Sequence, residues 1–208
     1  PFLKDFIINN STKIILWKII PGELDDKHIS KEEIGLLKIR KEKKSKEYFL
    51  AARKLLKNED SELTIEYDSK GKPYLNKEKG ISISHSNEIV AIGISNEIDF
   101  GIDIQYKTDK IFKIKNKFLS KSERKILGKT DDIQFLIKLW SAKESIFKAL
   151  NKQNVSFSRN IYVENINNNE NRGIGKYMSG NINIKFNLYF FYLNNYILCY
   201  AEKIYQSD

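Results

Sequence analysis

The sequence predicts an α+β protein made of two similar halves, each a small, mainly antiparallel sheet packed on helices. Its 208 residues suit one compact domain or two small ones, and 41% of them are hydrophobic, which is enough for a core. The predicted elements run strand, helices and strands, and then helices and strands again. We therefore expect pseudo-symmetric halves at residues 1–100 and 101–208, with the active site at their interface, where pockets are common.

The first half begins with a strand and a long helical stretch. Thr12–Ile20 is apolar and rich in β-branched residues, and Pro21 and Gly22 stop it. Ser30 with Glu33 three residues later forms a capping-box pattern, which starts a helical stretch that runs to about residue 58, with room for a break. Short strands separated by turn residues are expected at 63–67, 72–75, 81–84, 89–95 and 100–105.

The second half continues with helices and then strands. A helical region is expected at about residues 107–117, and Ser120 with Glu123 repeats the capping-box spacing. A longer helix is expected from about residue 131 to 150. Strand patterns follow at 161–163, 182–186 and 189–201, and the Asn-rich segment 165–171 among them is typical of a loop.

Composition limits the location and the partners without choosing a function. Lys and Arg number 36 against 27 Asp and Glu, and the net charge of +9 suits nucleic acids, anionic membranes, polyphosphate ligands or acidic proteins. No apolar stretch has the length of a membrane span, and the first residues, which we interpret as a chain that has lost its initiator Met, lack a signal-peptide pattern. The single cysteine, Cys199, excludes an intramolecular disulfide and is expected in the core. These features predict a cytoplasmic protein that needs no membrane.

Two short segments about forty residues apart indicate a functional site. Asp103 and Gln105 alternate along a predicted strand, so they point to one face. Trp140, Glu144 and Lys148 are spaced by four residues along a predicted helix, so they lie on one stripe. A strand that offers an acid beside a helix that offers an acid and a lysine could hold a divalent cation together with a phosphate.

Each of these residues also has an ordinary structural interpretation. An acid at a strand end, such as Asp103, is often a cap or a surface charge, and Trp140 by itself is more typical of a core. Glu144 could pair with Lys148 or Arg124 on the helix surface. The order and spacing of the elements together, and not any one of them, point to a function.

Five short motifs, taken in order, resemble the 4'-phosphopantetheinyl transferase superfamily, specifically its larger single-chain, surfactin-synthetase-activating type. They are Gly71–Pro73, Ile83–Ser86, Gly101–Asp103, Phe118–Ser120 with Glu123, and Trp140–Glu144 with Lys148. The cationic helix that ends in Ala51–Leu56 is also similar to the N-terminal half of that family. The resemblance covers most of the chain, and the last sixty or so residues match in general character.

The resemblance implies a transfer reaction between coenzyme A and a carrier protein. In this family coenzyme A binds between two pseudo-symmetric halves, and Mg²⁺ bridges its pyrophosphate to carboxylates. A serine of an apo acyl or peptidyl carrier protein attacks the phosphate that bears pantetheine, and 3',5'-ADP leaves. Residues 1–100 would be the nucleotide-binding side and residues 101–208 the metal and catalytic side. Carrier domains are usually acidic, so a basic surface would steer their encounter, and a monomer would suffice.

The resemblance also implies roles for individual residues. The implied metal ligands are Asp103, Gln105 and Glu144, and the implied catalytic residues are Glu144, Lys148 and Glu123, with either glutamate as the base. The implied coenzyme A contacts are Lys72, Ser84, His85 and Lys148, and Arg53 with Lys38 or Lys41 at the 3'-phosphate. Arg40, Lys43 and Lys44 compete with those two lysines, because the register of the helix is open by a turn.

Gln105 departs from the family pattern. Many members carry a glutamate two residues after the strand aspartate, where this chain has Gln105. A carboxamide oxygen can still ligate Mg²⁺ but adds no charge. The sequence therefore predicts weaker metal binding with activity retained.

Two alternative functions fit parts of the sequence. The net charge and the aromatic residues suit nucleic-acid binding, but no zinc-finger spacing, RRM-type aromatic motif or helix-turn-helix signature rises above background. A catalytically idle family member that acts as a binding or regulatory protein would be favoured by loss of Asp103, Glu144 or Lys148, and all three are present. The leading hypothesis is a Mg²⁺-dependent transferase with no nucleic-acid partner.

Overall fold

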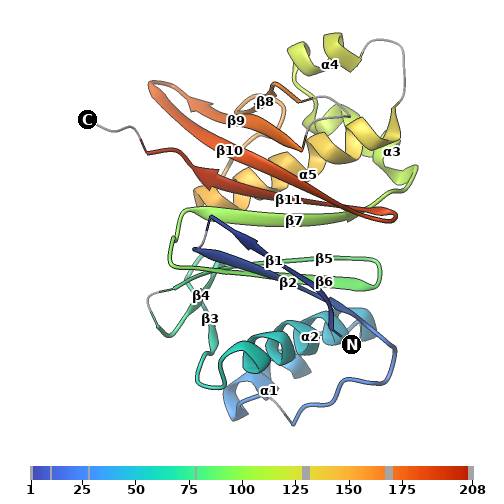
Figure 1. Cartoon of the computed structure of the whole chain (residues 1–208), viewed down its shortest axis with the longest axis vertical. Helices are drawn as coiled ribbons and strands as arrows, with labels where there is room; N and C mark the ends of the chain where they lie inside the picture. Colours follow the sequence, from blue (N-terminus) through green and yellow to red (C-terminus); the bar gives the residue numbers. More distant parts are fainter. Residues whose placement is uncertain are drawn as a thin grey trace. The chain divides into compact units, whose positions relative to one another are not determined.

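The protein is of the α+β class, with antiparallel sheets and helices packed on them. The computed structural model describes residues 2–9, 11–27, 29–77, 79–127, 132–166 and 171–205, and in these it contains five helices and eleven strands (Figure 1). The chain divides into two compact units, Pro1–Ile98 and Asp99–Asp208, which we call unit 1 and unit 2. None of the described helices is both long and apolar enough to cross a membrane.

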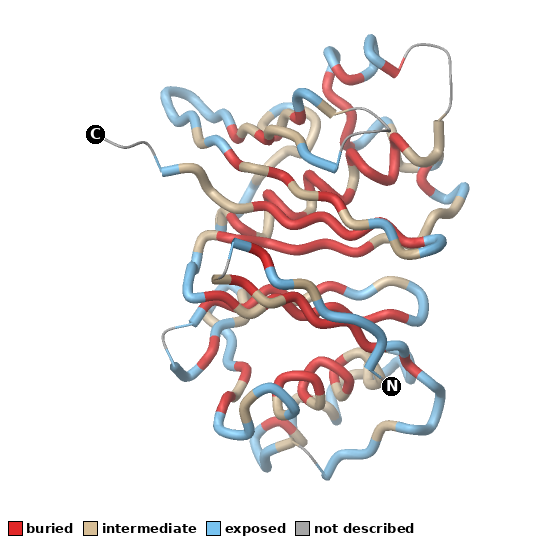
Figure 2. The backbone as a smooth tube through the Cα atoms, in the orientation of Figure 1, coloured by how far each residue is buried: buried red, intermediate tan, exposed pale blue. Residues whose placement is uncertain are grey.

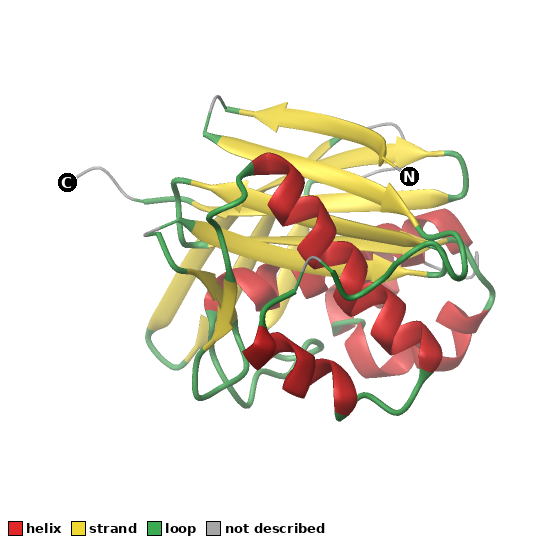
Figure 3. Ribbon diagram, turned by 90° about the horizontal axis from the view of Figure 1, so that it is seen from below, coloured by secondary structure: helices red, strands yellow, loops and turns green. Residues whose placement is uncertain are grey.

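Unit 1 is a four-stranded antiparallel sheet with a helix across one face. Its strands follow the order β1-β2-β6-β5, and their bounds are β1 Phe2–Ile8, β2 Thr12–Lys18, β5 Gly80–Ser86 and β6 Ile89–Ser95. Two further strands, β3 Ile65–Tyr67 and β4 Pro73–Leu75, form a small separate sheet. Helix α2, Lys43–Glu59, packs on the four-stranded sheet and covers a core that includes Trp17, Leu55, Val90 and Ile92 (Figure 3).

A capping box and an ion pair fix the helices of unit 1. The Ser30 hydroxyl accepts a hydrogen bond from the Glu33 N–H at 3.2 Å, and the Glu33 carboxylate accepts one from the Ser30 N–H at 2.9 Å, as the sequence predicts. Helix α1 then runs from Lys31 to Lys38, and a short non-helical segment separates it from α2. The same Glu33 carboxylate pairs with the Arg53 guanidinium at 2.7 Å, which ties α1 to α2.

Unit 2 is a five-stranded antiparallel sheet with a long buried helix on one face. The strands follow the order β7-β11-β10-β9-β8, with bounds β7 Phe100–Tyr106, β8 Ile161–Glu164, β9 Arg172–Ser179, β10 Ile182–Leu193 and β11 Tyr196–Lys203. The helices are α3 Lys110–Phe118, α4 Lys121–Leu127 and α5 Ile133–Leu150. Strands β7 and β11 and much of α5 are buried (Figure 2), and Cys199 of β11 lies fully in this core, which confirms its prediction as a core residue.

Helix α5 approaches strand β7 closely at Gly101. A Cβ atom at this position would collide with the Ser145 carbonyl oxygen and would lie 2.8 Å from the Ala149 nitrogen, so only glycine fits. One turn earlier, the Ser141 hydroxyl donates to the Asp103 carbonyl oxygen at 2.8 Å. This contact fixes the position of the strand that carries Asp103 against the helix that carries Glu144.

The sequence missed two strands and placed one turn wrongly. Strands β1 and β9 were not predicted, and β1 is mostly exposed, so it lacks the apolar signal of a core strand. The predicted strands 182–186 and 189–201 are in fact β10 and β11, joined at Asn194 and Asn195. Asn194 has φ of +47°, which suits a tight two-residue hairpin between the paired Leu193 and Tyr196.

Two boundary predictions fall partly outside the described residues. These are the start of the long helix at residue 131 and most of the Asn-rich loop at 165–171. Within the described part, Asp132 caps α5, since its carboxylate accepts from the N–H groups of Gln134 and Phe135.

Candidate active site

Strand β7 and helix α5 bring Asp103 and Lys148 into direct contact. The Lys148 ammonium lies 2.8 Å from Asp103 Oδ1 and also donates to the Ile102 carbonyl oxygen at 2.9 Å. Asp103 is 3% exposed, so its carboxylate depends on such partners. Of the two ordinary surface partners of Glu144, Arg124 bonds to Asn116, and Lys148 pairs with the strand aspartate while its charge also acts on Glu144.

Glu144 is held in an environment that disfavours its charge. Burial and the neighbouring negative charge of Asp103, in that order, raise the pKa of Glu144 to about 7, and Lys148 opposes the rise. Through this effect on the pKa of Glu144, the two carboxylates are coupled electrostatically. The two carboxylates therefore repel each other when both are ionised, and the single ammonium of Lys148 compensates only one of the two negative charges.

These groups fit a magnesium ion that shares its coordination with a phosphate. Within the residues that the structure describes, no group of three or more His, Cys, Asp and Glu is arranged as a metal centre. Mg²⁺, however, is often bound by one or two carboxylates together with substrate phosphates and water. Two interacting carboxylates, Asp103 and Glu144, meet that requirement, and they would be the residues that hold the ion.

Gln105 lies on the same face of β7 as Asp103, as the strand alternation predicts. Its side-chain Nε2 donates to Asp103 Oδ2 at 2.8 Å. Both oxygens of the Asp103 carboxylate are therefore engaged, one by Lys148 and one by Gln105.

Trp140 belongs to the packing of unit 2. Its ring lies 5.1 Å from that of Phe118 and 5.5 Å from that of Phe157, between ring centroids. These tilted aromatic contacts join α5 to the end of α3 and to the segment before β8. The core interpretation of this tryptophan is the one that the structure supports.

Glu123 lies in a buried cluster at the start of α4. It is 2% exposed, and its Oε2 accepts from the Lys143 ammonium and from the Ser120 N–H, each at 2.7 Å. Its Oε1 accepts from the Val163 N–H at 3.1 Å. The predicted capping box of Ser120 and Glu123 is confirmed, and the carboxylate of this glutamate is largely occupied by structural partners.

Lys143 connects four parts of unit 2 through its ammonium group. Besides Glu123, it lies 2.7 to 2.9 Å from the carbonyl oxygens of Phe118, Phe157 and Ile161, so its three hydrogens are shared among four acceptors. Burial lowers the pKa of Lys143, while the Glu123 charge opposes that shift. Of the two glutamates that the sequence left open as the base, Glu144 has the environment of a titrating group and Glu123 that of a structural ion pair.

Unit 1 contains a pocket of about 230 Å³ that gathers some of the predicted coenzyme A residues. Arg53 and His85 line it, as do Arg40 and Tyr48. The guanidinium groups of Arg40 and Arg53 lie 4.3 and 3.3 Å from the ring centre of Phe49. Because Glu33 pairs with Arg53, Arg40 is the guanidinium that adds positive charge for an anion at this pocket.

The other predicted coenzyme A residues do not line this pocket. Lys38 and Lys41 are exposed, and Arg40 occupies the place at the pocket that the sequence left open among several cations. Ser84 is buried and, one residue before His85 in β5, points to the opposite face of the sheet. Lys72 directly precedes the pocket residue Pro73, and its N–H donates to Asp68 at the turn before β4.

Tyr48 is a pocket residue that the sequence did not reveal. Its ring stacks on that of His85 with centroids 3.9 Å apart and planes 10° apart, and its hydroxyl donates to the Asn87 carbonyl oxygen at 2.7 Å. The stack holds the imidazole at the pocket wall. An aromatic residue one turn before Ala52 on the pocket face of α2 was the signal available.

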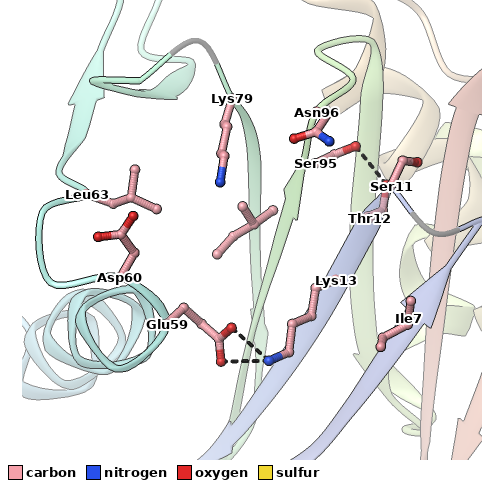
Figure 4. A pocket seen from close by; sticks show the side chains of 11 residues that line it. Ile7, Ser11, Thr12, Lys13, Glu59, Asp60, Leu63, Lys79, Ser95 and Asn96 are labelled. Atoms are coloured by element: carbon pink, nitrogen blue, oxygen red, sulfur yellow. Dashed lines mark hydrogen bonds and ion pairs between the residues drawn. The ribbon is translucent and has the colours of Figure 1, made fainter.

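A second pocket of unit 1, of about 270 Å³, contains none of the predicted site residues. It lies near the end of β6 and the C-terminal end of α2 (Figure 4). Two pairs of its polar side chains are engaged with each other, since Lys13 pairs with Glu59 at 2.7 Å and Thr12 donates to Ser95 at 2.7 Å. This pocket gives no indication of a ligand.

We predict that Glu123→Gln lowers the free energy of unfolding by about 3–5 kcal/mol, because it leaves the Lys143 ammonium buried without a counter-charge. The double variant Glu123→Gln/Lys143→Met should recover part of the loss. Urea unfolding followed by circular dichroism measures both. The control is Glu164→Gln, which breaks the more exposed pair with Lys176 and should cost less than about 1 kcal/mol.

An unchanged free energy of unfolding in Glu123→Gln, together with a large loss of activity, would contradict the structural role. Glu123 would then again be a candidate for the catalytic base.

Comparisons with known proteins find a family match over most of unit 2. The family model described as the 4'-phosphopantetheinyl transferase superfamily matches residues 99–201, which run from the start of unit 2 into β11. A curated protein of Aneurinibacillus migulanus, named 4'-phosphopantetheinyl transferase gsp, is 34% identical over 85 residues. That match covers 39% of this chain and 35% of the relative, so it spans about a third of the relative's length. Through residues 99–201, which carry Asp103, Glu144 and Lys148, the chain belongs to the 4'-phosphopantetheinyl transferase superfamily.

Proposed function

We propose that the protein transfers the 4'-phosphopantetheine arm of coenzyme A to a serine of an apo acyl or peptidyl carrier protein. The observation that carries the proposal is the cluster of Asp103, Lys148 and Glu144 on β7 and α5. Phosphoryl transfer depends mainly on neutralising and positioning the phosphates, which two acids with a metal ion and a lysine provide. The family match and the name of the relative support the same reaction.

The carboxylates of Asp103 and Glu144 would hold Mg²⁺ against the pyrophosphate of coenzyme A. The ion, when bound, neutralises phosphate charge and polarises the phosphorus for attack. Lys148, already at the same aspartate, would place its ammonium near the charge that develops on the leaving group. In this arrangement the repulsion between the two acids is relieved when coenzyme A and its metal ion bind.

Glu144 would act as the general base. The serine oxygen of the carrier forms a bond to the phosphorus that bears pantetheine, and the bond from that phosphorus to the bridging oxygen breaks. 3',5'-ADP leaves with the electron pair, and the serine proton passes to Glu144 directly or through water.

The unit 1 pocket would bind the 3'-phosphate of coenzyme A. Arg40 supplies positive charge there, Arg53 lines the same pocket while paired with Glu33, and His85, held by Tyr48, supplies a further donor. Arg40 takes the role that the sequence offered to Lys38 or Lys41. The pseudo-symmetry of the units and an active site at their interface stay predictions.

The proposed partner is a small acidic carrier domain. The net charge of +9 would steer such a domain toward the protein and make the encounter sensitive to salt. An idle binding protein is less well supported, because the two acids and the lysine needed for transfer are in contact or interact in the structure.

Mass spectrometry of apo carrier proteins incubated with coenzyme A and Mg²⁺ tests the proposed reaction. We expect at least one fatty-acid, polyketide or nonribosomal-peptide carrier to gain the mass of phosphopantetheine. Asp103→Ala and Glu144→Ala should abolish the gain, and the surface control Glu164→Ala should retain it. If no carrier gains this mass although the protein binds coenzyme A, the result contradicts the proposed reaction and favours the idle-protein alternative.

The role of Arg40 is tested with two forms of the donor substrate. We predict that Arg40→Ala raises the KM for coenzyme A at least about tenfold with little change in kcat, because a charged hydrogen bond to phosphate is lost. With 3'-dephospho-coenzyme A the variant and the unmodified protein should have similar KM values. The control is the exposed neighbour Lys41 changed to alanine, and a larger effect at Lys41 than at Arg40 would contradict the assignment.

A further inference from the structure

Two neighbouring side chains occupy both oxygens of the Asp103 carboxylate. Lys148 Nζ lies 2.8 Å from its Oδ1, and Gln105 Nε2 donates to its Oδ2 at 2.8 Å. Asp103 is 3% exposed, and these two side chains replace much of the water that it has lost.

An amide and a carboxylate at position 105 would act in opposite ways on Asp103. The amide nitrogen of Gln105 carries hydrogens and donates them to the aspartate. A glutamate at this position has no hydrogen to donate when ionised, so it would repel Asp103 unless a cation lay between them. Gln105 therefore supplies a hydrogen bond to the Asp103 carboxylate. A glutamate at the same position would add a second negative charge, which a bound cation would have to neutralise.

The charges around Asp103 also indicate that a cation is held weakly by the protein alone. The ammonium of Lys148 compensates the Asp103 carboxylate, and Gln105 adds no charge. Of these side chains on β7 and α5, Glu144 is the one further acid. Mg²⁺ gives up its water reluctantly, so a site with so little negative charge holds it weakly.

We propose that Gln105 is a positioning residue that keeps Asp103 paired in the free protein, and that a divalent cation binds tightly only together with coenzyme A. The inference rests on the proposed function, since the pyrophosphate of coenzyme A supplies the missing negative charge. The coupling is reciprocal: the cation increases the affinity for coenzyme A by the same factor by which coenzyme A increases the affinity for the cation.

Binding of Mn²⁺, followed by the electron paramagnetic resonance signal of the free ion, tests this inference. In the unmodified protein, saturating coenzyme A should tighten Mn²⁺ binding at least about tenfold beyond what a protein-free titration of coenzyme A explains. Gln105→Glu should tighten binding to the free protein at least about tenfold, because it adds a negative charge beside Asp103, and should reduce the coupling. The matched control is Gln153→Glu, which adds the same charge at an exposed position after α5 and should change neither quantity.

The measurement on the unmodified protein stands even if a variant fails to fold. Tight Mn²⁺ binding without coenzyme A, or an unchanged affinity in folded Gln105→Glu, would overturn the inference. Failure of the transferase proposal has a different signature, since coupled binding of Mn²⁺ and coenzyme A would persist while no carrier gained mass. Isothermal titration calorimetry measures coenzyme A binding in two titrations, one in EDTA and one with Mn²⁺ in place of EDTA. If coenzyme A binds in neither titration, both proposals are overturned.

Discussion

The contact between strand β7 and helix α5 at Gly101 is the constraint on which the candidate site depends. Without a side chain at this position, the strand can lie against the helix backbone at Ser145 and Ala149. Hydroxyl groups of the helix then reach the sheet, with Ser141 at the Asp103 carbonyl oxygen and Ser145 at that of Cys199. Close approach of the two backbones is what allows Lys148 to reach a buried aspartate on the neighbouring strand.

Two consecutive residues of α5, Lys143 and Glu144, lie in different environments and have different roles. Lys143 points into the core, where Glu123 and three carbonyl oxygens hold it. Glu144 lies roughly 100° further around the helix and interacts with Asp103 and Lys148 instead. The buried ion pair fixes the rotation of the helix, and the rotation directs the titrating acid to the site. The buried pair of Lys143 with Glu123 and the interacting acids Glu144 and Asp103 are thus linked, because Lys143 and Glu144 are adjacent in the helix.

Local patterns predicted much of this arrangement. The capping boxes at Ser30 and Ser120 and the alternation of Asp103 with Gln105 follow from contacts within a few residues, and the structure contains them. The pairing of Lys148 with Asp103 involves residues 45 positions apart, so spacing indicated a shared site but not the contact itself.

Most features of the site that the sequence does not predict depend on contacts between residues far apart in the chain. The stacking of Tyr48 on His85 joins α2 to β5, and no local pattern specifies it. The position of Arg40 at the pocket depends on how the chain turns between α1 and α2. The opposite orientations of Ser84 and His85, in contrast, follow from strand alternation and were predictable.

The central claim is that the β7–α5 contact holds two acids, Asp103 and Glu144, in a repulsive interaction that a cation and a phosphate would relieve. Titration of the Glu144 carboxyl by ¹³C NMR in the metal-free protein tests it most directly, with Glu144→Gln to identify the resonance. The account predicts a pKa of about 7 that falls in Asp103→Asn, because the neighbouring negative charge is removed. An ordinary glutamate pKa in the metal-free protein, unchanged by Asp103→Asn, would contradict it.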